Sequence, residues 1–125
     1  MDPKSVSNEF RTEIINWCQY NYGGNLVALA LFDPTDVDAS YPHSDINVLM
    51  VVNIAPGNAR DRYEVVTEEL MQTITPRPLS CRVQTVGELN MLAELGLPLF
   101  EIYLRNSEII YDPKQVLESG RANLK

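Results

Sequence analysis

The sequence has few of the side chains that bind metals through nitrogen or sulfur. Its 125 residues include one histidine, His43, and two cysteines, Cys18 and Cys81. Neither cysteine has a histidine or a second cysteine at metal-ligand spacing, which argues against a zinc site. We expect both cysteines to be reduced and buried.

Long apolar runs and basic residues are also scarce. No apolar run reaches the roughly 20 residues of a membrane-spanning helix, and residues 1–5 lack the layout of a signal peptide. A cytoplasmic protein with no membrane partner is therefore expected. The net charge of −7 argues against nucleic acid as a direct partner, because Lys and Arg drive binding to phosphate backbones. A single nucleotide such as ATP needs only a local site and is compatible with this charge.

The chain instead alternates helical and strand patterns over a length typical of one domain, residues 1–125. The helices are indicated by apolar residues at helical spacing and, for one of them, by a Thr85-x-x-Glu88 capping box. Helices are predicted over about 3–20, 59–74, 85–95, 98–105 and 112–119, and strands over 26–32, 46–53, 79–84 and 108–111. This order predicts an α/β (α+β) fold, with a small mixed β-sheet and helices packed on it.

The stretch 26–53 joins two buried strands through a polar, acidic loop. Residues 26–32 are consecutive apolar residues, a pattern typical of a strand buried on both faces. Asp45 and Asn47 stand at the start of the second strand. Because strand side chains alternate, we expect both to point to one face of the sheet.

This stretch resembles the nucleotidyltransferase superfamily that includes DNA polymerase beta, and its minimal single-domain members in particular. Phe32 falls on the phenylalanine of the family's Phe-Gly-Ser turn, and Pro42 on a common loop proline. Ser44 and Asp45 fall on the Ser-Asp pair that opens the next strand. The resemblance covers about residues 10–115 and implies a nucleotidyltransferase-like fold.

Several nucleotide-binding positions of the family motif are altered in this chain. The family Gly-Ser pair falls on Asp33 and Pro34, and proline has no N–H to donate to a phosphate. The loop arginine falls on Thr35 or Val37, and the loop glycine falls on Asp38. Ser44 keeps its family identity.

The metal-binding positions are altered as well. In this family two magnesium ions, about 3.5–4 Å apart, clamp the reacting oxygens. Asp45 is retained, but the second aspartate falls on Asn47, which offers an oxygen without a charge. The third acid would lie on the face of Ser80, Arg82 and Gln84, where Arg82 is a fixed positive charge. We therefore expect no cofactor and predict that Arg82 pairs with Asp45 in place of a metal.

The resemblance implies a non-catalytic binding or partner protein. Minimal members of the family often act as antitoxin beside a small helical toxin, so such a protein is the expected partner, with a homo-oligomer as another possibility. An acidic surface suits the masking of a basic partner. The alternative is an enzyme that moves a nucleotide from ATP to a protein, with Mg²⁺ on Asp45 and a second carboxylate from Glu88 or the 33–38 loop.

Simpler interpretations exist for the same residues. Asp45 can cap a turn at the start of its strand. Asp33, Asp36 and Asp38 are spaced loosely as in a calcium loop, but the turn glycine and closing glutamate are missing, which favours a solvated acidic loop. His43 is a single loop histidine with no partner evident in the sequence.

Overall fold

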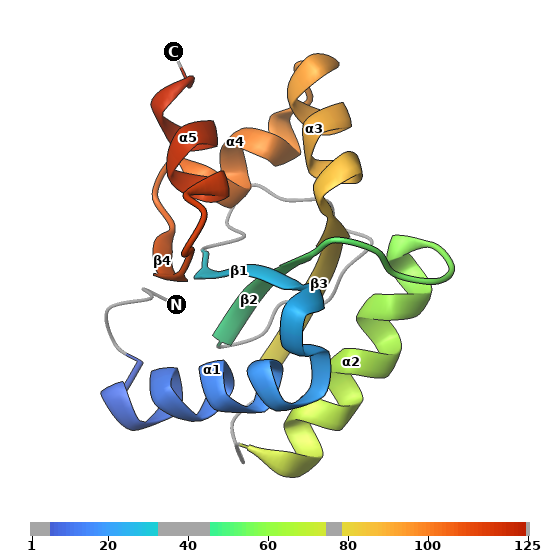
Figure 1. The fold of residues 1–125 in the computed structure, drawn as a ribbon, viewed down its shortest axis with the longest axis vertical. Coiled ribbons are helices and arrows are strands. Elements are labelled where there is room, and N and C mark those ends of the chain that lie inside the picture. The colour runs from blue at the N-terminus through green and yellow to red at the C-terminus, as the bar shows by residue number, and fades with distance from the viewer. Residues whose placement is uncertain (1–5, 33–45, 75–78, 125) are drawn as a thin grey trace.

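The computed structural model describes residues 6–32, 46–74 and 79–124, and their centre is a mixed β-sheet (Figure 1). Within these residues the sheet has four strands in the order β3-β2-β1-β4. Strands β2 and β3 are parallel, and β1 is antiparallel to both of its neighbours. The strands are β1 (Leu26–Leu31), β2 (Ile46–Val52), β3 (Leu79–Thr85) and β4 (Glu108–Tyr111).

Helices cover both faces of this sheet (Figure 1). One face packs against α1 (Asn8–Tyr22) and α2 (Ala59–Thr73). The other packs against α3 (Val86–Glu94), α4 (Pro98–Leu104) and α5 (Val116–Ala122). A short 3₁₀ turn, η2 (Gly23–Asn25), connects α1 to β1. The predicted mixed α/β architecture is therefore confirmed.

Both central strands are buried along their whole length, as their apolar sequences predict. Every described residue of β1 and β2 is buried, and so is Phe32, which follows β1. Helix α2 connects the parallel strands β2 and β3. This connection leaves β3 beside β2, so that polar residues of the two strands lie side by side.

The N-terminal boundary of the first helix was predicted wrongly. Val6 and Ser7 are not helical, so the helix does not begin near Pro3. It begins at Asn8, because the Ser7 side chain accepts a hydrogen bond from the backbone N–H of Phe10 (3.1 Å). A serine N-cap of this kind satisfies one of the free N–H donors of the first helical turn.

The last helix lies further along the chain than the sequence predicted. It begins at Val116 rather than near Pro113, because Gln115 adopts a left-handed conformation (φ 57°). The Asp112 carboxylate accepts hydrogen bonds from the N–H groups of Val116 and Glu118, both at 2.9 Å. The helix also continues through Gly120, where a Cβ atom would lie 2.9 Å from Leu104 Cδ1. Glycine is therefore needed at this position for close packing of α5 on α4.

Other local predictions are confirmed. Thr85 and Glu88 form the expected capping box at the start of α3. Gly96 follows α3 with φ 64°, a conformation that glycine adopts without strain. Cys18 and Cys81 are buried free thiols, and burial raises the pKa of Cys18 to about 12. No helix in the described part of the chain is long and apolar enough to cross a membrane.

Candidate functional site

The predicted site residues divide into two that the structure describes and four that it does not. Asn47 lies on β2 and Arg82 on β3. Asp33, Pro34, Ser44 and Asp45 lie outside the described residues, together with the acidic loop and His43.

Asn47 lies beside Ser80 at the start of the parallel strand pair. The Ser80 hydroxyl donates a hydrogen bond to Asn47 Oδ1 (2.8 Å), and the two residues are adjacent in the β-sheet register. Both side chains are buried. The backbone carbonyl of Asn47 accepts a hydrogen bond from Phe32 N–H (3.0 Å), which fixes the end of β1 against β2. The side-chain oxygen of Asn47 is thus engaged by a neutral hydroxyl inside the protein.

Arg82 is the buried cation of this region, with 6% of its surface exposed. Its guanidinium carbon lies 5.6 Å from the centre of the Phe32 ring, a cation–π arrangement. A charge taken out of water is costly unless other groups of the protein compensate it. The face of β3 on which the resemblance implies the third carboxylate, that of Ser80, Arg82 and Gln84, therefore holds a buried positive charge.

Two further polar residues, Gln84 and Tyr103, lie on the same side of the sheet as Arg82. Gln84 Nε2 donates a long hydrogen bond to the Tyr103 hydroxyl (3.4 Å). The rings of Tyr103 and Phe32 meet edge to face, with centroids 5.1 Å apart. Tyr103 comes from α4, and its contribution was missed because this contact depends on how α4 packs across the sheet. We call Asn47, Ser80, Arg82 and Gln84, which β2 and β3 direct to this face, the inner polar face.

The inner polar face offers an amide, a hydroxyl and a guanidinium. Magnesium prefers carboxylate and other oxygen ligands, and a neighbouring guanidinium repels any cation. Among residues 6–32, 46–74 and 79–124, no group of three or more His, Cys, Asp or Glu side chains could hold a metal ion. The described part of the site thus carries side-chain amides, a hydroxyl and a guanidinium, and the inner polar face holds no carboxylate.

Glu88, considered above as a source of a second carboxylate, is already engaged elsewhere. It forms a two-pronged ion pair with the buried Arg62, with N–O distances of 2.7 and 2.9 Å. The hydrogen bond from Arg62 lowers the pKa of Glu88 to about 2. Glu88 also lies beyond the C-terminal end of β3, while Asn47 and Ser80 lie at the opposite end. The strand between Ser80 and Thr85 alone spans roughly 17 Å.

Arg62 was not singled out in the sequence, although it connects three parts of the structure. Besides Glu88, its guanidinium donates hydrogen bonds to the carbonyls of Pro56, Gly57 and Val83. These contacts hold the turn after β2, helix α2, the end of β3 and the start of α3 together. Arg62 is buried between the exposed Asp61 and the buried Tyr63, and the burial of a charged residue is not evident from apolar periodicity.

Two hollows lie outside the inner polar face. A groove of about 840 Å³ runs between α3, α4 and α5, and Leu89, Phe100 and Gly120 are among its lining residues. A smaller, mainly apolar pocket of about 420 Å³ lies beside the start of α2, lined in part by Tyr22 and Val65. Both are of a size that binds ligands or side chains of a partner.

Comparison with protein-family models gives no match for this chain, and comparison with curated proteins gives none either.

Proposed function

We propose that this chain is a nucleotidyltransferase-like protein whose metal site has degenerated and that works as a non-catalytic binding or partner protein. The proposed partner is a small helical protein, in an antitoxin-like arrangement, with self-association as the other possibility. The family assignment rests on the resemblance of the sequence over about residues 10–115. The mixed sheet, with β2 and β3 parallel and adjacent, is compatible with it.

The observation that carries this proposal is the composition of the inner polar face. Asn47 stands where the resemblance implies the second aspartate, and Arg82 lies on the face of β3 where it implies the third acid. Asn47 Oδ1 is bound by the Ser80 hydroxyl, and Arg82 is buried over Phe32. Loss of charge stabilisation at one catalytic position commonly costs about 3 kcal/mol of transition-state stabilisation. Two such changes on one face support a binding role in place of two-metal transfer.

The same proposal gives Arg82 a structural task. Its guanidinium takes the position of a metal ion and pairs with the Asp45 carboxylate, so that the frame of the site persists without Mg²⁺. A cytoplasmic location belongs to this proposal, and the two buried free thiols suit a reducing compartment.

Calorimetric titration with ATP, in the presence and absence of Mg²⁺ or Mn²⁺, tests the loss of catalysis. We expect no metal-dependent heat for the natural chain. Radiolabelled ATP incubated with the chain and metal should leave no label on the protein.

The control variants are Asp45→Ala, at the retained motif position, and Glu101→Ala, an exposed acid of α4 paired with Arg105. Metal-dependent ATP binding that disappears in Asp45→Ala and persists in Glu101→Ala would contradict the proposal. That result would favour the enzyme alternative, with the missing carboxylate supplied by the 33–38 loop.

A further inference from the structure

The apolar pocket beside the start of α2 has the features of a docking site for another protein. Its volume is about 420 Å³, and apolar atoms dominate its lining, which includes Tyr22, Pro56, Val65 and Val83. This volume is sufficient for one or two large apolar side chains. The pocket lies on the α1–α2 side of the molecule, separate from the inner polar face.

The walls of the pocket are fixed by hydrogen bonds. The turn that carries Ala55 and Pro56 is held by Asn25, whose side chain donates to Ile54 O (2.8 Å) and accepts from Ile54 N–H (3.0 Å). Arg62 fixes the same turn from the other side through the Pro56 and Gly57 carbonyls. A rigid pocket loses little conformational entropy when a ligand binds, which favours affinity.

Large apolar side chains lie exposed at this pocket. Val65, which lines it, is 56% exposed on α2, whose outer face also exposes Met71 (43%) among mainly polar residues. Ile54, which directly precedes the lining residues Ala55 and Pro56, is 76% exposed. Exposed apolar side chains that lie together beside a pocket are characteristic of an interaction site.

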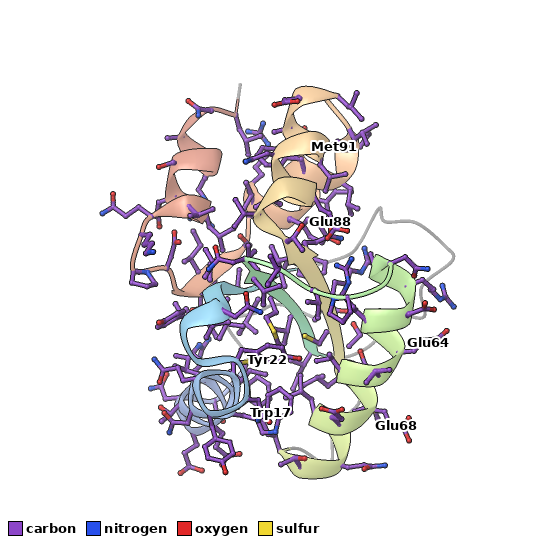
Figure 2. All side chains as sticks on the ribbon, turned by 45° about the vertical axis from the view of Figure 1, so that its right-hand side comes forward. Trp17, Tyr22, Glu64, Glu68, Glu88 and Met91 are labelled. Carbon is purple, nitrogen blue, oxygen red and sulfur yellow. The ribbon has the colours of Figure 1, made fainter. Side chains whose placement is uncertain are left out.

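Carboxylates flank the exposed valine on α2. Asp61 lies one turn before Val65, and Glu68 and Glu69 lie one turn after it, so the four residues share one stripe of the helix. Asp61, Glu68 and Glu69 are all exposed, and Figure 2 shows Glu68 and the neighbouring Glu64 projecting away from the sheet. The positive side chains of this helix are engaged locally, since Arg60 pairs with Glu64 and Arg62 with Glu88.

One of these acids also acts electrostatically on a residue that lines the pocket. The pKa of Tyr22 is raised to about 12, first by burial, then by Cys81, and after these by the negative charge of Glu69. An apolar hollow beside three exposed carboxylates is complementary to a positively charged ligand with an apolar anchor.

We propose that this surface, formed by the pocket, Val65 and the carboxylates of Asp61, Glu68 and Glu69, binds a basic segment of a partner protein. Apolar side chains of that segment fill the pocket, and its Lys or Arg side chains lie against the carboxylates of α2. This inference deepens the proposed role as a partner protein and rests on it. The α1–α2 side is then the binding face, and its apolar pocket and carboxylates select a partner with apolar and basic side chains.

The test uses a phage-displayed library of random peptides selected against the full chain, followed by fluorescence anisotropy with synthetic peptides from the selected clones. We expect selected peptides to be basic and to contain large apolar residues. Binding should weaken by about tenfold in a Glu68→Lys/Glu69→Lys variant and by several-fold in Val65→Ser. It should also weaken as salt rises from about 50 to about 300 mM, because screening shortens the range of the attraction.

The matched controls are Glu94→Lys and Met91→Ser, which replace an acidic and an apolar residue on α3 in the same way. Met91 is 60% exposed, so both controls change surface residues, as the α2 variants do (Figure 2). The controls should change affinity by less than about twofold.

Failure to enrich basic peptides, or equal weakening by the α2 and α3 variants, would overturn the inference. The ATP titration distinguishes this failure from that of the proposed function. A metal-dependent ATP signal that depends on Asp45 refutes the non-catalytic role, whatever the peptides do. Loss of peptide binding alone refutes only the assignment of this surface.

Discussion

Removal of the Glu88 carboxylate should destabilise the protein more than removal of any exposed acid. The perturbation is Glu88→Ala, which takes away the partner of the buried Arg62 and the carboxylate that accepts a hydrogen bond from Thr85 N–H (2.8 Å). The guanidinium of Arg62 would keep its carbonyl acceptors Pro56, Gly57 and Val83. It would nevertheless lose the negative charge of Glu88, its partner in the ion pair.

The expected magnitude follows from the ion pair and the cap. A pKa lowered from 4.5 to about 2 corresponds to about 3 kcal/mol in a fully shielded site. Because the Glu88 side chain is 36% exposed, solvent screening reduces this contribution to about 1–2 kcal/mol. The hydrogen bond from Thr85 N–H is one of the causes of the lowered pKa, so its contribution is already included in this range. We therefore expect Glu88→Ala to lower the free energy of unfolding by about 1–2 kcal/mol.

The assay is urea unfolding followed by circular dichroism and by Trp17 fluorescence. At pH 7 the natural chain and Glu88→Ala should differ by the full amount. Since the folded-state pKa of Glu88 is lowered, its stabilisation is complete above about pH 4.5 and is lost as the pH falls toward 2. The difference between the two proteins should therefore shrink at pH 3.

The control is Glu101→Ala, which removes an exposed i,i+4 partner of Arg105 and should cost no more than about 0.5 kcal/mol. A double-mutant cycle with Arg62→Met and Glu88→Gln isolates the pairwise contribution. If the coupling in that cycle is below about 0.5 kcal/mol, or if Glu88→Ala unfolds no more easily than Glu101→Ala, the reasoning about this ion pair is wrong.

Three further predictions concern packing, capping and the thiols. Gly120→Ala should lower the free energy of unfolding by about 1 kcal/mol, because the new methyl group overlaps the fully buried Leu104. In the same urea assay Gly87→Ala should be neutral or stabilising, because the nearest atom to its new Cβ is 3.9 Å away. Ser7→Ala should cost about 1 kcal/mol through loss of the N-cap of α1, and an unchanged urea midpoint would place the helix start elsewhere. Cys18 and Cys81 should react with a thiol reagent only when the chain unfolds, because both are buried and burial raises the pKa of each; rapid labelling of the native protein, followed by absorbance, would contradict this burial.

Most of the fold follows from patterns that are visible in the sequence. The continuous apolar run of β1 predicted burial on both faces, and all six residues of that strand are buried. The alternation in β3 also predicted that Leu79, Cys81 and Val83 share one face, and all three lie in the core that contains buried residues of α1 and α2. The helix starts were harder to predict, because Ser and Asp residues are common both as helix N-caps and in turns. Ser7 caps α1, which therefore begins at Asn8 and not near residue 3, and the left-handed Gln115 delays the start of α5.

The site was predictable only where strand alternation decides it. Alternation placed Ser80, Arg82 and Gln84 together, and the parallel pairing of β2 with β3 then brings Asn47 beside Ser80. Contacts between distant segments were not predictable, because they depend on how helices pack. The edge-to-face contact of Tyr103 with Phe32 is one example. The two-pronged ion pair of Arg62 with Glu88 is another.

The central claim is that Arg82 replaces a metal ion at a site that no longer transfers nucleotides. Anomalous diffraction from crystals grown with Mn²⁺ and ATP tests it most directly, because manganese would be seen at any remaining metal position. The account predicts no manganese peak beside Asn47 and Ser80, with the Arg82 guanidinium paired to the Asp45 carboxylate. A manganese ion bound by Asp45, with Arg82 turned outward to solvent, would contradict it.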